Sequence, residues 1–190
     1  MTAYLLALSS VLTFSTAAIG FTYFSQKVSA LWMNIFKAVI SLIFSLPIIF
    51  YLRGDLSVSA EHWPFLVSGV IGLNVADWMI LGAYKIIEPA RTLIVYGFQP
   101  FIVGGFSYFF WEERLFPLQF LAILFFVICL FLFSYERFKT RGKWEVDGLV
   151  LAFVGVVLDS IGIILTRHGF NLNPELNGFD AQYIRTFAAV

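Results

Sequence analysis

Long uninterrupted apolar runs constrain this chain more than any other feature of its sequence. A helix needs about 20 apolar residues to cross roughly 30 Å of hydrocarbon. Six runs separated by short polar segments meet this requirement: Ala3–Phe24, Leu31–Leu52, Trp63–Tyr84, Thr92–Trp111, Pro117–Tyr135 and Gly148–Thr166. Because these runs are continuous and do not alternate, they predict helices and not the strands of a membrane barrel. The expected fold class is an all-α integral membrane protein.

The composition of the chain agrees with a lipid environment. Of its residues 60% are hydrophobic and 13% are charged, whereas soluble proteins average about 25% charged residues. A soluble globular domain is therefore excluded, and the bilayer is an expected partner. The formal net charge is zero, which argues against a nucleic-acid partner, since that would require a clustered basic face. We expect a multi-pass protein of the cell membrane, either plasma or inner.

A seventh apolar run begins near the end of the sequence, at Ala181, and reaches Val190. This run is too short to cross a bilayer. We therefore expect six complete transmembrane helices and a truncated seventh, with three to four further spans missing. A homodimer is the alternative source of the missing half.

Positive charges in the loops predict an orientation. Loops after the first, third and fifth runs hold most of the Lys and Arg residues: Lys27, Lys85, Arg91, Arg137, Lys139, Arg141 and Lys143. Loops after the second, fourth and sixth runs hold Arg53, Arg114 and Arg167. The positive-inside rule then places the odd loops in the cytoplasm and the N-terminus outside.

Two parts of the chain read alike. The segment 32–38, with Lys37, is similar to the segment 183–188, with Arg185, and each places a cation a few residues inside an apolar run. The segments 18–21 and 160–163 are also similar. A repeat of about 145 residues that contains an odd number of spans must invert in the membrane, which is typical of transporters.

The stretch from Gly72 to Phe133 carries a family resemblance. Its elements are Ala83-Tyr84, Gln99-Pro100 in the fourth run, Glu113-Arg114-Leu115 and Gln119. This pattern resembles the first half of an EamA-type carrier of the drug/metabolite transporter superfamily. Three departures are Ala122 in place of a usual Gly, Lys37 in place of a common Arg, and a charge count that opposes the cytoplasmic N-terminus usual in the family.

The resemblance implies an inverted five-helix repeat bundle. Residues 1–135 would form the first repeat, 136–147 a polar linker, and 148–190 the incomplete start of a second repeat. It also implies a secondary transporter, acting as an exporter of a small metabolite, that alternates access between the two repeats.

Ionisable groups inside the apolar runs are the candidate site residues. Each such group costs at least about 2.5–3.5 kcal/mol at membrane depth, so it needs a partner, water or a neutral state. Asp77 shares a helix face with Asn74 and Tyr84, and Asp159 shares one with Gly155 and Gly162. Asp77 would bind a cationic group of a solute or take up a proton; the alternative is an Asp that locks two helices together.

The resemblance assigns the first, third, fourth and sixth spans to the walls of a solute cavity. The residues that it gathers there are Ser15, Thr16, Asp77, Tyr96, Gln99 and Asp159, and Asn74 joins them through the helix face it shares with Asp77. Two acids facing one cavity would couple transport to protons if desolvation favours their neutral forms.

Four further residues have expected roles outside direct solute binding. Lys37 and Arg185 lie near helix starts, where either gating of the pathway or anchoring by snorkelling would explain them. Pro100 should bend the fourth helix, because it removes a backbone hydrogen bond. Glu113 should stabilise the start of the fifth helix through the helix dipole.

Two other functional classes compete with a carrier. A membrane-embedded enzyme is disfavoured, since His62 and His168 fit no metal-ligand spacing and no nucleophile motif is present. An intramembrane hydrolase using Asp77 and Asp159 is the remaining form of that hypothesis. A non-transporting membrane subunit would fit the incomplete chain. No metal or cofactor is expected.

Overall fold

The computed structural model describes residues 2–25, 27–53, 59–111 and 146–190, with scattered residues from 117 to 135, and all of its elements are helical. The elements are α1 (Thr2–Ser25), α2 (Ala30–Arg53), η1 (Ala60–His62), α3 (Trp63–Ser68), η2 (Gly69–Ala76), α4 (Asp77–Tyr96), α5 (Gln99–Trp111), α7 (Val146–Leu172) and α8 (Gly178–Ala189). The predicted all-α class is confirmed over this part of the chain. Most of the predicted fifth span, with Glu113 and most of the linker, lies outside the described residues.

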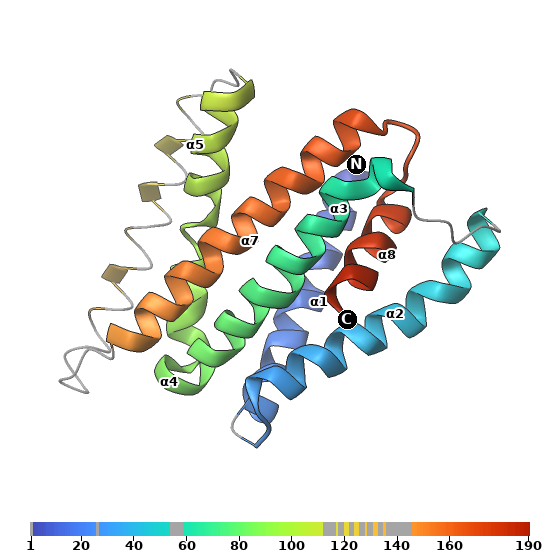
Figure 1. Cartoon of the computed structure of the whole chain (residues 1–190). Coiled ribbons are helices and arrows are strands. Elements are labelled where there is room, and N and C mark those ends of the chain that lie inside the picture. Colours follow the sequence, from blue (N-terminus) through green and yellow to red (C-terminus); the bar gives the residue numbers. More distant parts are fainter. Residues whose placement is uncertain are drawn as a thin grey trace.

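Among the described residues, four segments are long and apolar enough to cross a membrane: Tyr4–Ser25, Ala30–Tyr51, Ala60–Phe110 and Val146–Leu172. The third has 51 residues, which as one straight helix would measure about 75 Å, more than twice the hydrocarbon thickness. It is not straight, because the backbone of Glu88, just before Pro89, has φ 67° and ψ 153°. In Figure 1 the chain reverses in α4, and α5 runs back beside α7.

The second and eighth helices begin with similar caps. Ser29 Oγ accepts a hydrogen bond from the Trp32 backbone N–H at 3.2 Å at the start of α2. Asn177 Oδ1 accepts from the N–H groups of Phe179 and Asp180 at 2.8 and 3.0 Å at the start of α8. Such side chains satisfy N–H groups that the helix leaves unpaired, so the polar loop residues fix where each helix starts.

Glycines every seventh residue along α7 form its contact with the α3–η2–α4 helix. A Cβ added to Gly155 would lie 2.8 Å from Ile80, one added to Gly162 would lie 3.0 Å from the Cα of Gly72, and one added to Gly169 would lie 2.7 Å from Phe65. Gly148 meets Ile86 and Ile87 in the same way. The partners descend in number as the glycines ascend, so the two helices are antiparallel and their backbones almost touch.

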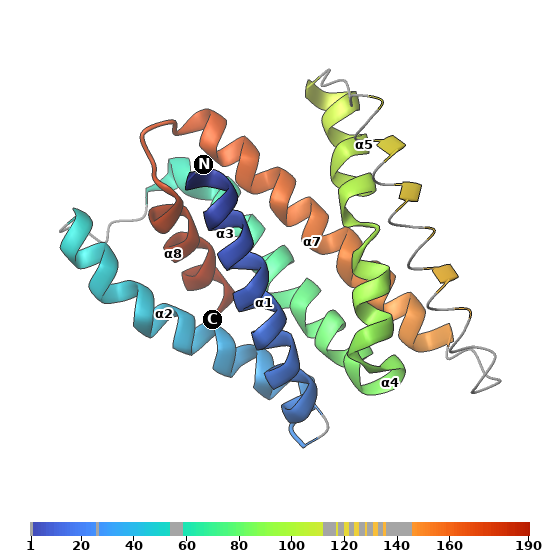
Figure 2. The same ribbon diagram turned by 180° about the vertical axis from the view of Figure 1, so that it is seen from behind.

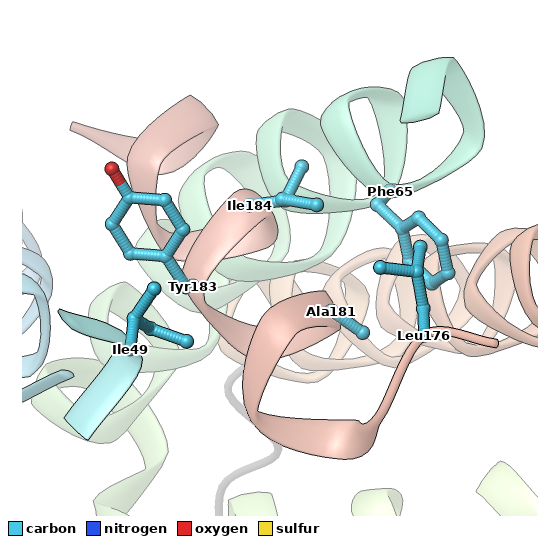
Figure 3. Close-up of a cluster of buried hydrophobic side chains, with 6 residues drawn as sticks. All are labelled: Ile49, Phe65, Leu176, Ala181, Tyr183 and Ile184. Atoms are coloured by element: carbon cyan, nitrogen blue, oxygen red, sulfur yellow. The ribbon is translucent and has the colours of Figure 1, made fainter. Parts of the chain in front are cut away.

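The short helix α8 packs between α2 and α3, as both Figure 1 and Figure 2 show. A cluster of buried apolar side chains holds it there: Ile49, Phe65, Leu176, Ala181, Tyr183 and Ile184. In Figure 3, Tyr183 lies beside Ile49, and Leu176 lies beside Phe65. The outer faces of the bundle are also apolar. Phe44, Phe50 and Phe109 on these faces are exposed by 72%, 67% and 81%, respectively. This distribution suits a bundle surrounded by lipid.

The first pair of helices, α1 and α2, and the last pair, α7 and α8, point in opposite directions. In Figures 1 and 2, α1 ends and α2 begins at the lower end of the bundle, whereas α7 ends and α8 begins at the upper end. The pair α7–α8 therefore points the opposite way to the pair α1–α2.

The strained backbone of Glu88 generates a first prediction. Its φ and ψ fall in a region that is essentially confined to glycine and costs other residues about 1–3 kcal/mol. Glu88→Gly should therefore be more stable than Glu88→Ala by about 1 kcal/mol, after the entropy cost of glycine is subtracted, because both variants remove the side chain and only glycine relieves the backbone. The measurement is thermal unfolding in detergent. Glu88→Ala, which removes the side chain but keeps a Cβ, is the matched control and should give no gain.

The glycine contact generates a second prediction. Gly162→Ala should lower the thermal midpoint in detergent, although alanine favours a helix by about 1 kcal/mol, because the added methyl group meets the backbone of Gly72. Gly20→Ala on α1 is the control, since nothing lies within 4 Å of that position. Equal midpoints for the two variants would show that the close approach is not required.

Candidate functional site

A cavity of about 760 Å³ opens between α1, α2, η2, α4, α7 and α8. Its polar lining residues are Ser9, Ser10, Thr13, Lys37, Ser41, Asp77, Tyr84, Tyr96, Asp159 and Gln182. Phe14, Phe21, Leu73, Ile80 and Leu81 are among its apolar lining residues. A volume of this size is in the range of small-molecule sites, which combine apolar walls with a few polar groups.

An ion pair crosses one wall of the cavity. Lys37 Nζ on α2 donates a hydrogen bond to Asp77 Oδ2 at the start of α4, and the two side chains are 28% and 22% exposed. The pair neutralises both charges, which reduces the cost of holding them at membrane depth. It also connects α2 to the helix that packs against α7.

The second acid has different partners. Asp159 lies on α7 and is 8% exposed. Its Oδ2 accepts a hydrogen bond from the Tyr96 hydroxyl group and another from Gln99 Nε2, the latter at 2.6 Å. Tyr96 ends α4 and Gln99 begins α5, so the turn at Gly97 and Phe98 brings both donors onto one carboxylate oxygen. Both donors are neutral.

The segment η2 is a π-helix next to Asp77, and its wider turns leave carbonyl groups open to outside donors. Asn34 Nδ2 on α2 donates to the Asn74 carbonyl oxygen at 2.8 Å. Asn74 is half-buried and does not line the cavity. Its contact with Asn34 is made by its backbone carbonyl group and not by its side chain. Asn34 was not singled out in the sequence, because nothing local links residues that lie 40 positions apart.

Arg185 lies on α8 behind the cavity wall. A Cβ added to Gly72 would lie 3.6 Å from a terminal nitrogen atom of Arg185 and 3.5 Å from Asp159 Oδ1. Arg185 Nε is buried and has no hydrogen-bond partner among the described residues. Gln182, one turn earlier on α8, is the residue of this helix that reaches the cavity.

Ser15 and Thr16 do not lie on the cavity wall. Both are exposed, and their hydroxyl groups donate to the carbonyl groups of Val11 and Leu12 at 2.8 and 2.9 Å. The hydroxyl groups of α1 that reach the cavity belong to Ser9, Ser10 and Thr13. These residues share one helical face with Phe14, Ala17 and Phe21, and this spacing is the sequence signal that would have found them.

The remaining expected residues have structural positions. Pro100 lies in the first turn of α5, after the break at Gly97 and Phe98, so the bend comes from two helical segments that meet at this break. Glu113 lies outside the described residues. No group of three or more His, Cys, Asp or Glu that could hold a metal ion occurs among the residues that the structure describes.

The sequence matches the model of the EamA-like transporter family over residues 1–135, which is more than half of the chain. The chain belongs to the EamA-like transporter family. Members of this family are membrane transporters of small solutes and not enzymes, which agrees with the apolar helices of this protein. No curated protein and no solved structure matched the chain.

The ion pair generates a third prediction. Lys37→Met and Asp77→Asn should each destabilise the protein by roughly 1–3 kcal/mol, because each leaves the partner charge unpaired in a half-buried position. The double variant should lose less than the sum of the single losses. Thermal unfolding of the four proteins in one detergent measures this coupling. Additive losses would show that the two side chains act independently.

Proposed function

We propose that this EamA-family protein is a secondary carrier that exports a small metabolite across the cell membrane. The observation that carries the proposal is the cavity, which holds the Lys37–Asp77 pair and Asp159 within an apolar bundle. Every ionisable group at membrane depth is costly, and such groups usually mark a solute or ion pathway. Hydroxyl groups of α1 and the Tyr84 and Tyr96 side chains complete a wall suited to a polar solute.

The proposed carrier contains two inverted repeats and six complete crossings. The reversal at Glu88 supports two crossings within Ala60–Phe110, and the apolar run at 117–135 supplies another. The opposite directions of α1–α2 and α7–α8 support the inversion. Lys37 follows the cap at Ser29 by the same interval as Arg185 follows the cap at Asn177, which supports the pairing of α2 with α8.

The proposed mechanism is alternating access around this cavity. The Lys37–Asp77 pair joins two helices of the first repeat, and Asp159 on α7 is bonded to Tyr96 and Gln99 of the first repeat. Rocking of one repeat against the other must change the bonds of Asp159, since they cross between the repeats. Exchange of these bonds for bonds to a solute would connect binding to the rocking motion.

A flux measurement tests the proposal as a fourth prediction. Membrane vesicles that contain the protein should move one or more labelled metabolites from a panel of amino acids, sugars and nucleosides. Asp77→Asn should reduce this flux at least tenfold. Asp147→Asn, an exposed carboxylate at the start of α7, is the matched control and should keep the flux.

Insertion must be verified for each variant, by protease protection or by quantitative blotting of the vesicles. Unchanged flux in Asp77→Asn, with the protein inserted, would reject the assignment of this residue to the pathway. An absence of flux for every metabolite with the unmodified protein would contradict the carrier itself.

A further inference from the structure

The two acids of the cavity differ in whether a cationic side chain is bonded to them. Asp77 is paired with Lys37 across the α2–α4 contact. For Asp159, no Lys or Arg of the described residues lies within ion-pair distance, and its two bonded partners are the uncharged groups of Tyr96 and Gln99. Asp159 is therefore the carboxylate whose negative charge has no cation bonded to it in the described part of the chain.

The unused bonding capacity of Asp159 is confined to one atom. Both hydrogen bonds arrive at Oδ2, whereas Oδ1 accepts none from the described residues. The side chain lines the cavity although the residue is 8% exposed. An ionised carboxylate held out of water strongly favours a further donor, and a cationic donor most of all.

The cavity that Asp159 lines also holds groups that suit an ammonium ion. Tyr96 and Phe14 both line the cavity, and their ring centroids lie 6.4 Å apart. Aromatic rings attract a cation through their faces, and this attraction grows when the cation is desolvated. The hydroxyl groups of Ser10 and Thr13 on α1 also line the cavity and would accept remaining ammonium hydrogens.

We propose that the Asp159 carboxylate binds a protonated amine of the transported solute, in the cavity that the rings of Tyr96 and Phe14 also line. This inference rests on the proposed carrier function and adds the chemical class of the solute. The charged groups facing the site from its neighbours are Lys37, Asp77 and Arg185. Lys37 is matched by Asp77, whereas the Arg185 guanidinium lies behind the cavity wall, where it and Asp159 Oδ1 both approach Gly72.

Three probes of similar shape test the chemistry with the 190-residue protein in detergent. They are phenethylamine, which carries only an ammonium group, phenylalanine, which carries both charges, and 3-phenylpropionate, which carries only a carboxylate. We expect the first two to bind at millimolar concentration by calorimetry and the third not to bind. Tighter binding of phenylalanine than of phenethylamine would identify a dipolar solute, and the reverse order a simple amine.

Variants assign the binding to the Asp159 carboxylate. Asp159→Asn should weaken ammonium binding at least tenfold, while its amide oxygen can still accept from Tyr96 and Gln99, which helps the fold to survive. Asp159→Glu, which keeps the charge, should restore part of the binding. Asp147→Asn on the same helix is the matched control and should bind as the unmodified protein does. A melting curve of each variant checks that it is folded.

The results that overturn the proposal are distinct from a failure of the carrier function. Binding of 3-phenylpropionate as tight as that of the amines, no binding of either amine, or equal losses in Asp77→Asn and Asp159→Asn would each overturn it. Vesicle flux of an anionic or uncharged metabolite, unaffected by excess phenethylamine, would leave the carrier standing and reject the ammonium site.

Discussion

The close approach of α7 to the α3–η2–α4 helix is the constraint on which the remaining structure depends. Lipid offers no hydrophobic drive for two apolar helices to associate, so contact between them must come from packing and polar bonds. Glycines on α7 let the backbones meet, and at the crossing Gly162 faces Gly72. Ser68 adds a hydrogen bond to the Gly162 carbonyl oxygen at 2.7 Å. This contact places Asp159 and Asp77 on the same cavity.

The π-helical turns of η2 allow that contact to continue over the length of α7. The glycines of α7 are seven residues apart, whereas their partners Ile87, Ile80, Gly72 and Phe65 are seven, eight and seven residues apart. The eighth residue falls in the segment that contains η2. A wider turn accommodates one extra residue without rotating the rest of the helix, so the register above and below the segment is preserved. The same turns release the Asn74 carbonyl group to Asn34.

Much of the helical architecture could be predicted from the sequence, because membrane helices are specified by long apolar runs. The break near Pro89 was also predictable, since proline disfavours a helical residue before it. The face of α1 that lines the cavity could not be read from local sequence, because that face depends on how the helix is rotated against its neighbours. Ser15 and Thr16 therefore lie outside the wall that Ser9, Ser10 and Thr13 form.

The hydrogen-bond partners of Asp77 and Asp159 could not be predicted from the sequence. Asp77 and Asp159 are conspicuous as charges in apolar runs, but Lys37 lies 40 residues from Asp77, and Tyr96 lies 63 residues from Asp159. Local spacing carries no information on such pairs. The expectation that Lys37 either anchors or gates did not include the pair with Asp77, which follows only from the packing of α2 against α4.

The convergence of Tyr96 and Gln99 on one oxygen has a mechanical consequence. The two donors belong to separate helical segments joined at Gly97 and Phe98. If α5 tilts relative to α4, the two donors move apart, and Oδ2 of Asp159 loses at least one of them. The number of hydrogen bonds that Asp159 on α7 accepts therefore depends on the angle between α4 and α5.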